Sequence, residues 1–219
     1  MSESALPTQR VEVRNSRETI LAVALKLFTT KGYDGTSIDD IRAGAGFKSK
    51  ASLYTHFKSK EEVAQALMNR IIKQIDDVFS YKEDDLEPLV RFTTVIRKLV
   101  EWANTHSQEC VFYMIRGQQK KLKGKNDLDS KQPSKGEATF LSIVQQLRVD
   151  YPVRLVTSEV LLSIVFAVLA ESLLDEGAFG NIDFEEKVEE LVSICFGVIF
   201  SSEVIPVSKS YFTGNPMFD

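Results

Sequence analysis

The chain has 219 residues, of which 43% are hydrophobic and 26% are charged, with a formal net charge of −4. Such a composition is typical of an ordinary globular protein and excludes a disordered, collagen-like or membrane chain. The two cysteines, Cys110 and Cys195, lie far apart and lack the spacing of a zinc module or a disulfide framework. We therefore expect reduced thiols in a cytoplasmic protein that needs no metal and no cofactor.

No stretch of the sequence predicts a targeting segment or a membrane span. The first 17 residues contain acids and have no apolar core, unlike a signal peptide. The most apolar run, residues 160–170, is about half as long as the roughly 20 residues that a bilayer span requires. We interpret this run as a buried core helix and expect no contact with a membrane.

Charge is distributed unevenly along the chain. The first 60 residues hold ten Lys or Arg and six Asp or Glu, a net +4, whereas the remaining residues carry a net −8. A basic head on an acidic body favours contact with a polyanion such as DNA through the head alone. Chance segregation of the charges is the alternative interpretation.

The apolar residues recur at intervals of three and four, which predicts helices rather than strands and therefore an all-α fold. A first helix is expected between a cap at Ser16 and a terminating Gly32. A second, short helix follows Thr36, a third begins near Ser49, and a long fourth begins after a cap at Ser59. Glycines separate the second helix from the third.

Five further helices are expected in the rest of the chain, over residues 89–103, 110–115, 136–149, 156–175 and 183–202. The polar stretch 120–136, rich in Lys, Asp and Ser, is interpreted as a mobile loop. The last two helices are apolar on more than one face and must be covered on more than one side.

A second copy of the chain is the expected cover for the last two helices, in a four-helix contact, and an intramolecular core is the alternative. The side chains expected at the dimer interface are apolar residues of these helices: Leu161, Ile164, Val165, Val168, Leu191, Ile194, Cys195 and Val198.

Two short helices separated by a glycine-containing break, with one helix before and a long helix after, are typical of a helix-turn-helix, whose second helix enters the major groove of DNA. At the residue level, the region from Ser16 to Leu67 resembles the TetR family of transcriptional regulators. The resemblance is carried by the words ILAVALKLFTTKGYDGTSIDDI, AGAGF and SKASLYTHFKSKEEVAQAL, in that order.

The resemblance implies an N-terminal three-helix DNA-binding domain, joined by a long helix to a larger helical domain that binds ligand and dimerises. The expected divisions are a flexible arm at 1–15, the helix-turn-helix domain at 16–62, the helical domain at 63–205 and a tail at 206–219.

The resemblance also implies which side chains meet DNA. Those that correspond to positions facing base edges are Lys50, Ala51, Ser52 and Thr55. Those that correspond to phosphate contacts are Ser37, Tyr54, His56 and Lys60. The chemistry is reasonable in its own right, because a lysine can donate to guanine, and hydroxyl groups can donate or accept.

Three features depart from the usual family pattern. Between the turn glycine and Tyr54 the chain is one residue longer, the extra residue being Phe47 or Lys48, and Lys48 becomes a further candidate for contact with DNA. Arg42 stands where the family usually has a small residue and is expected to reach the DNA backbone. Asp39 would repel phosphate unless a base edge or a neighbouring Lys or Arg engages it.

In TetR-like proteins the body holds a small-molecule pocket, and its occupancy changes the separation of the two DNA-reading heads. A small, mostly apolar effector would contact aromatic and soft side chains of the middle helices. The candidates are Phe92, Trp102, Phe112, Tyr113, Met114, Phe140 and Phe166. Arg116 either anchors an acidic ligand or compensates the dipole of a helix end.

The expected function is that of a homodimeric, ligand-responsive regulator, a repressor that a small molecule releases from a pseudo-palindromic operator. An enzyme is not expected, because the hydrolase, zinc-protease and phosphate-loop motifs are missing. His106 and Cys110 supply too few ligands for a metal site. The alternative is an all-helical interaction protein whose helix-turn-helix no longer binds DNA specifically.

Overall fold

The computed structural model describes residues 7–79, 86–122, 134–174 and 179–202. Apart from one isolated antiparallel bridge between Val153 and Phe200, the regular secondary structure in these ranges is helical, so the predicted all-α fold is confirmed. No helix in the described ranges is long and apolar enough to cross a membrane.

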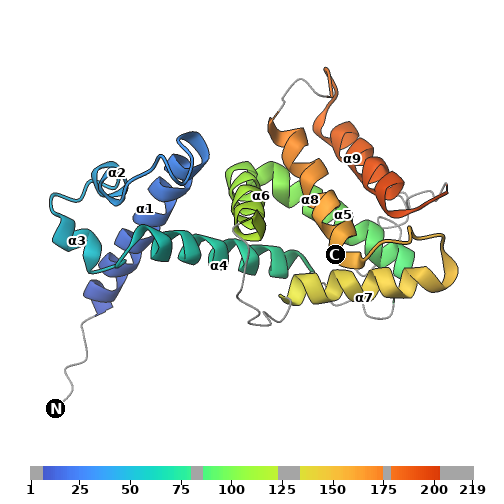
Figure 1. Ribbon diagram of the computed structural model, residues 1–219, viewed down its shortest axis with the longest axis horizontal. Coiled ribbons are helices and arrows are strands. Elements are labelled where there is room, and N and C mark those ends of the chain that lie inside the picture. The colour runs from blue at the N-terminus through green and yellow to red at the C-terminus, as the bar shows by residue number, and fades with distance from the viewer. Residues whose placement is uncertain (1–6, 80–85, 123–133, 175–178, 203–219) are drawn as a thin grey trace, which may run out of the picture.

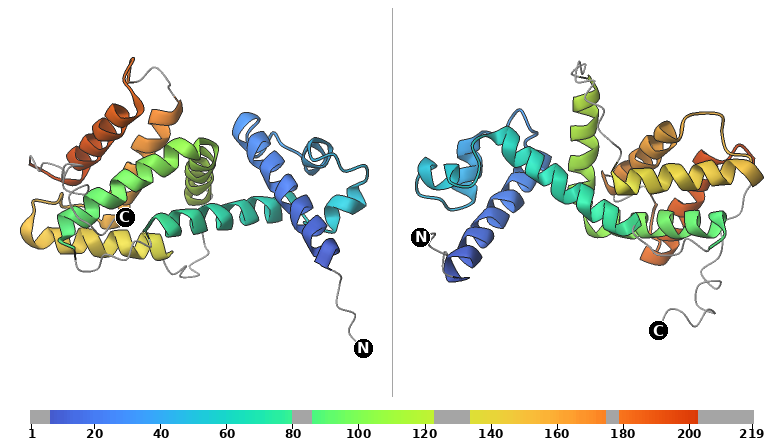
Figure 2. Two further views of the ribbon diagram at one scale, coloured as in Figure 1. Left: turned by 180° about the vertical axis from the view of Figure 1, so that it is seen from behind. Right: turned by 90° about the horizontal axis from the view of Figure 1, so that it is seen from below.

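The helices form two parts joined by one long helix (Figure 1). The head consists of α1 (Pro7–Thr30), α2 (Ile38–Gly44) and α3 (Lys50–Tyr54). The connecting helix is α4 (Lys60–Phe79), and the views in Figure 2 agree that it runs from the head into the body. The body contains α5 (Pro88–Thr105), α6 (Ser107–Leu122), α7 (Lys135–Asp150), α8 (Ser158–Leu174) and α9 (Phe184–Ile199).

The first helix begins at Pro7 instead of near Ser16, so the expected flexible arm at 1–15 is wrong from Pro7 onward. Proline is tolerated in the first turn of a helix, and no Gly or Pro interrupts the chain between Pro7 and Gly32. Gly32 ends the helix in the left-handed region, at φ 76°, as expected.

Side-chain caps fix where several helices begin. Ser37 and Asp40 form a reciprocal capping box at α2, and Ser49 caps α3. The Ser59 hydroxyl accepts from the backbone N–H of Glu62 at 3.1 Å, as the predicted cap of α4. These caps confirm the predicted starts of the second, third and fourth helices.

The later helices differ from the prediction mainly in length. The helix expected at 110–115 extends over Ser107–Leu122, so the first three residues of the predicted loop are helical. The remainder of that loop up to residue 133 and the tail at 206–219 lie outside the described residues.

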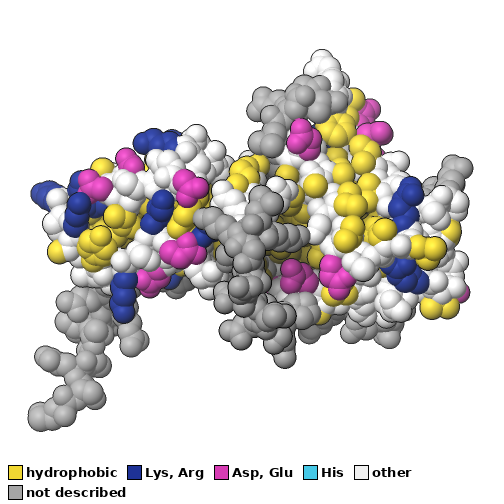
Figure 3. Space-filling view, viewed as in Figure 1, with side chains coloured by type: hydrophobic (Ala, Val, Ile, Leu, Met, Phe, Trp, Pro, Cys, Tyr) yellow, Lys and Arg dark blue, Asp and Glu magenta, His cyan; other side chains and the backbone are white. Residues whose placement is uncertain are grey.

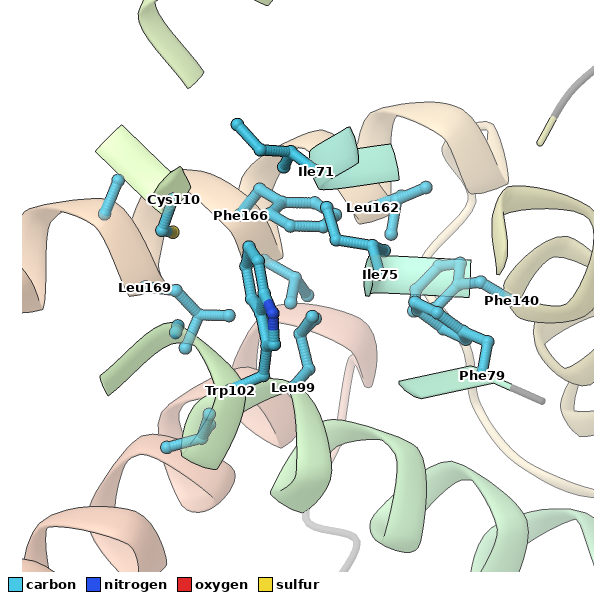
Figure 4. Packing of buried hydrophobic residues seen from close by; sticks show 14 of the residues in the cluster. Ile71, Ile75, Phe79, Leu99, Trp102, Cys110, Phe140, Leu162, Phe166 and Leu169 are labelled. Carbon is cyan, nitrogen blue, oxygen red and sulfur yellow. The ribbon is translucent and has the colours of Figure 1, made fainter. Parts of the chain in front are cut away.

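α5 lies at the centre of the body and contacts the other four body helices and α4. The ring of Phe92 packs against Phe140 of α7, Phe196 of α9 and Phe200, with centroid distances of 5.3–6.1 Å. Figure 4 shows how α4 joins this packing, with Ile71, Ile75 and Phe79 directed toward body side chains. The connecting helix is therefore part of the body core as well as of the head.

Two glycines in helices have opposite surroundings and test the packing of the head. A Cβ added at Gly44 of α2 would lie 2.7 Å from Cγ1 of Val23 in α1, whereas a Cβ at Gly117 of α6 would meet nothing within 4 Å. A β-branched valine in a helix has little rotamer freedom with which to move away.

We expect Gly44→Ala to lower the free energy of unfolding by about 1–3 kcal/mol through overpacking. Gly117→Ala should raise it by about 0.5–1 kcal/mol, because alanine loses less backbone entropy in a helix. Urea unfolding followed by far-UV circular dichroism, at equal protein concentrations, measures both. Equal effects of the two substitutions would contradict the close contact between α1 and α2.

Candidate nucleic-acid interface

The turn between α2 and α3 is built around one left-handed residue. α2 ends at a cap on Ala45, and Gly46 follows with φ 77°, a conformation that glycine adopts without strain. Ser49 then caps α3, whose inward residue Leu53 is 1% exposed. The sequence thus folds here into two short helices that share a core, with the opposite face of α3 directed outward.

The predicted base-facing side chains lie together on this outer face. Lys50, Ala51, Ser52 and Thr55 are all exposed, and Lys48 is exposed just before the helix. Tyr54 is 45% exposed although it is a large aromatic residue. Figure 3 shows Lys and Arg side chains over the end of the head, with acidic side chains among them.

Two of the predicted phosphate contacts also have roles inside the head. Ser37 is exposed at the N-terminus of α2, where its hydroxyl accepts from the backbone N–H of Asp40 at 3.0 Å. The half-buried ring of His56 lies 5.8 Å from the ring of Phe47.

Lys60 differs from its expected role. Its ammonium group donates to the backbone carbonyls of Tyr33 and Thr36, each at 2.8 Å, and lies 4.2 Å from the centroid of the Tyr33 ring. These bonds hold the loop between α1 and α2 against the start of α4. We therefore do not carry Lys60 into the DNA-contacting set.

Asp39 is engaged by two neighbouring cations. Its Oδ1 accepts from Arg42 Nε at 2.7 Å and lies 3.9 Å from Lys50 Nζ. The hydrogen bond from Arg42 is the main reason that the pKa of Asp39 lies below its usual value. The carboxylate is thus ionised at neutral pH, and its charge is compensated inside the head.

A second group of polar residues joins the head to the body. The buried guanidinium of Arg116 in α6 pairs with Glu61 Oε2 at the start of α4, and its Cζ lies 4.1 Å from the centroid of the Tyr33 ring. The hydroxyl of Tyr33 donates to the same Glu61 oxygen at 2.6 Å. We call Tyr33, Lys60, Glu61 and Arg116 the joint cluster.

Burial, and then the hydrogen bond to Glu61, raise the pKa of Tyr33 to about 12, so its phenol stays neutral and remains a donor. Phe28 of α1 stacks on Phe112 of α6 at 5.6 Å beside the joint cluster. The ion pair between Arg116 and Glu61 was not predicted, because no local sequence pattern connects residues that are 55 positions apart.

The predicted ligand-binding side chains do not all come together. Phe92 and Phe140 pack with each other in the core between α5, α7 and α9. Phe112 and Arg116 face the head instead. The half-buried Met114 packs against the hydrophobic core.

The three remaining candidates are Trp102 of α5, Tyr113 of α6 and Phe166 of α8. Tyr113 packs on Phe166 at 5.1 Å. Figure 4 shows the Trp102 indole directed into the cluster that contains Phe166 and Leu169, and its Nε1 is buried without a hydrogen-bond partner.

The predicted dimer residues divide into two sets. The side chains of four of them, Leu161, Val165, Leu191 and Cys195, are buried within the protomer and cannot form an outer contact surface. The prediction is wrong for these four, because they lie on the faces of the helices that point into the protomer core. Ile164 and Ile194 are exposed, and Val168 and Val198 are half-buried. Figure 3 shows hydrophobic side chains along the face formed by α8 and α9.

Both cysteines are buried in the hydrophobic core. Burial raises the pKa of Cys110 and of Cys195 to about 12, so both thiols stay protonated at neutral pH. Within the described residues, no group of three or more His, Cys, Asp or Glu side chains could hold a metal ion.

The fold and the exposed face of α3 define a helix-turn-helix protein with a helical body. Residues 20–67 match the model of the bacterial regulatory proteins of the tetR family. The helix-turn-helix domain is thus of the TetR-family type, as the resemblance predicted.

Two curated relatives match about a third of the chain. IcaR of Staphylococcus epidermidis, a negative transcriptional regulator of the biofilm operon icaADBC, is 40% identical over 70 residues, which are 32% of this chain and 34% of IcaR. IcaR of Staphylococcus aureus strain Newman is 38% identical over 77 residues, which cover 32% of this chain and 41% of that protein. The matched region thus spans about a third of the length of IcaR from Staphylococcus epidermidis. These relatives are regulators, not enzymes.

Solved structures share the fold of both parts. A tetR-family regulatory protein from Rhodococcus RHA1 aligns with TM-score 0.67 at 14% identity, over 86% of this chain and 98% of that one. AibR, solved with isovaleryl coenzyme A and operator DNA, aligns with TM-score 0.61 at 19% identity, over 82% and 97% of the two chains. At these identities the likeness concerns the fold.

Proposed function

We propose that this protein is a homodimeric transcriptional repressor that binds a pseudo-palindromic operator and is released by a small molecule. The observation that carries the proposal is the exposed outer face of α3, which lies within the residues that match the tetR-family model. Binding to operator DNA would place the protein in the cytoplasm, associated with the nucleoid.

The proposed DNA surface consists mainly of exposed side chains on and beside α3. Lys50 would approach base edges, together with Ala51, Ser52 and Thr55 of the same short helix. Tyr54 and Lys48 would donate to phosphates. The Ser37 hydroxyl donates to Asp40, so Ser37 would exchange this bond for one to a phosphate beside the N-terminus of α2. His56 lies at the margin of this surface.

The proposed dimer surface follows one stripe on each of two helices. Val160, Ile164 and Ala167 are exposed along α8 at intervals of four and three residues, and Ile194 and Gly197 are exposed three apart on α9. Ala167 and Gly197, each three residues after an exposed isoleucine, are small and allow close approach of helices from a second copy. Two copies related by a two-fold axis would then present recognition helices about 34–36 Å apart, one turn of DNA.

The proposed effector is small and mostly apolar, and its site lies around Trp102, Tyr113 and Phe166. The buried Trp102 Nε1 without a partner supports this, because a buried donor is stabilised when a ligand supplies an acceptor. The joint cluster offers a route from this site to the head, since Tyr113 and Arg116 lie on successive turns of α6.

Selection of DNA tests the recognition surface. We expect the protein to enrich a short inverted repeat from a random-sequence duplex library at near-physiological salt. The double variant Lys50→Ala, Tyr54→Ala should not enrich it, because it loses a base donor and a phosphate donor in each protomer. Lys73→Ala, an exposed lysine of α4, is the matched control and should select the same repeat. Failure of the unsubstituted protein to enrich any sequence would favour the alternative, an interaction protein with a degenerate helix-turn-helix.

Substitution on α8 tests the dimer. Ile164 is 40% exposed in the protomer, and Ile164→Lys would bury unpaired charges at the proposed interface. The dissociation constant of the dimer should rise roughly a hundredfold or more, measured by analytical ultracentrifugation. Val149→Lys, at an exposed position near the end of α7, should leave the dimer intact. A dimer that tolerates Ile164→Lys would require a different interface.

Release by an effector is tested with the only tryptophan of the chain, Trp102. Isovaleryl coenzyme A, fatty acids and aromatic acids should include a compound that changes the Trp102 emission and weakens binding to the selected duplex by roughly 5–150-fold. In Arg116→Met the change in emission should remain, while the loss of DNA affinity should become smaller. Indifference of DNA affinity to every compound would count against effector control.

A further inference from the structure

Arg42 is joined to Phe47 by two bonds that cross the turn. The guanidinium Nη1 donates to the Phe47 carbonyl, and the backbone N–H of Phe47 donates to the Arg42 carbonyl at 3.1 Å. Arg42 also donates through Nε to Asp39 one turn earlier on α2. Only 22% of the Arg42 side chain is exposed, so most of this group is directed into the head and not toward solvent.

Phe47 occupies the longer part of the turn, where the sequence has one residue more than the usual family spacing. Its half-buried ring packs against the head core and lies 5.8 Å from the ring of His56, just beyond the end of α3. The backbone of Phe47 is thus tied to α2 and its side chain to the far end of α3. Phe47 therefore fixes the longer turn relative to both α2 and the C-terminal end of α3.

The charge of Arg42 is compensated within the protein. Its hydrogen bond raises its own pKa and is the main cause of the lowered pKa of Asp39, so the two groups are ionised together. A guanidinium that binds a carboxylate and a carbonyl at once uses its fork geometry, which the single ammonium group of a lysine cannot reproduce. The same geometry leaves Arg42 poorly directed toward a DNA backbone.

We infer that Arg42 is a positioning residue for DNA recognition: by holding Phe47 it fixes the orientation of α3 and thereby the sequence preference of the protein. It does not act as a phosphate contact, contrary to the prediction from the sequence. The inference rests on the proposed function, because it concerns how the proposed DNA surface is aimed.

The experiment compares Arg42→Lys and Arg42→Met with the unsubstituted protein on two duplexes. One is the inverted repeat that the unsubstituted protein selects, and the other is a scrambled duplex of equal length and composition. Affinities are measured over a series of salt concentrations, with Lys48→Met as the reference for loss of an exposed lysine.

We expect both Arg42 variants to lose about tenfold in affinity for the selected duplex, the order of one base contact, and to keep their affinity for the scrambled duplex. The slope of log K against log salt should stay unchanged in both. Lys should fail to rescue, because it retains the charge without the two-sided bond. This equality of Lys and Met distinguishes positioning from charge.

Other results would overturn the inference. If Arg42 binds phosphate, Arg42→Lys should behave like the unsubstituted protein, and Arg42→Met should flatten the salt slope by about two for a dimer. Loss of affinity for both duplexes would show instead that Arg42 maintains the fold of the head.

Asp39→Asn gives a milder second variant, because the bond from Arg42 to Phe47 can persist. Positioning predicts a lower ratio of selected to scrambled affinity. A phosphate role for Arg42 predicts an unchanged ratio, and this outcome would overturn the inference. If the unsubstituted protein binds neither duplex, the proposed function itself fails, a result that is distinct from all of these.

Discussion

The proposed DNA-reading face depends on a helix that cannot stabilise itself. α3 has five residues, and isolated helices shorter than about 12–15 residues are marginal in water. Its order must therefore come from its attachments: the buried Leu53, the Ser49 cap and the turn residue Phe47. Because the first two fix mainly the position of α3, its orientation relative to α2 depends on how the turn is held. Changes in the turn can therefore alter sequence preference without altering any residue that faces DNA.

α4 carries this constraint into the rest of the molecule. Its buried residues contribute to the head near Val63 and to the body near Phe79, so one helix belongs to two cores. A 20-residue helix is roughly 30 Å long and moves as a unit. At its first turn, Glu61 accepts both from Tyr33 of the head and from Arg116 of the body. A displacement of α6 would act on the same carboxylate that holds the loop before α2, and would in this way carry an event in the body to the proposed DNA surface.

The sequence predicted the parts of the fold that local chemistry determines. The helix caps and the terminating glycine could be predicted because each acts within three or four residues; they are Ser37, Ser49, Ser59 and Gly32. The start of α1 was misplaced because Ser16 is compatible both with a cap and with a helix interior, and only the residues before it decide between them. On α8 and α9 apolar residues lie on several faces, so the sequence does not show which face is buried in the protomer, and the predicted interface residue Leu161 is in fact buried there. Contacts such as Arg116 with Glu61 follow from packing over long separations, which no local pattern contains.

The pairing of charges in the head could not be predicted from the sequence. The sequence gives a positive head, but it does not say which charges are available to a partner. In the folded head, Asp39 is engaged by Arg42, Asp40 accepts from Ser37 and lies 3.6 Å from Lys31, and Glu61 pairs with Arg116. These three carboxylates thus pair with groups inside the protein, while Lys48 and Lys50 are exposed on or beside α3. A polyanion approaching this end would therefore meet lysines whose repulsive neighbours are already compensated, and internal ion pairing does as much as net charge to make the surface attractive to DNA.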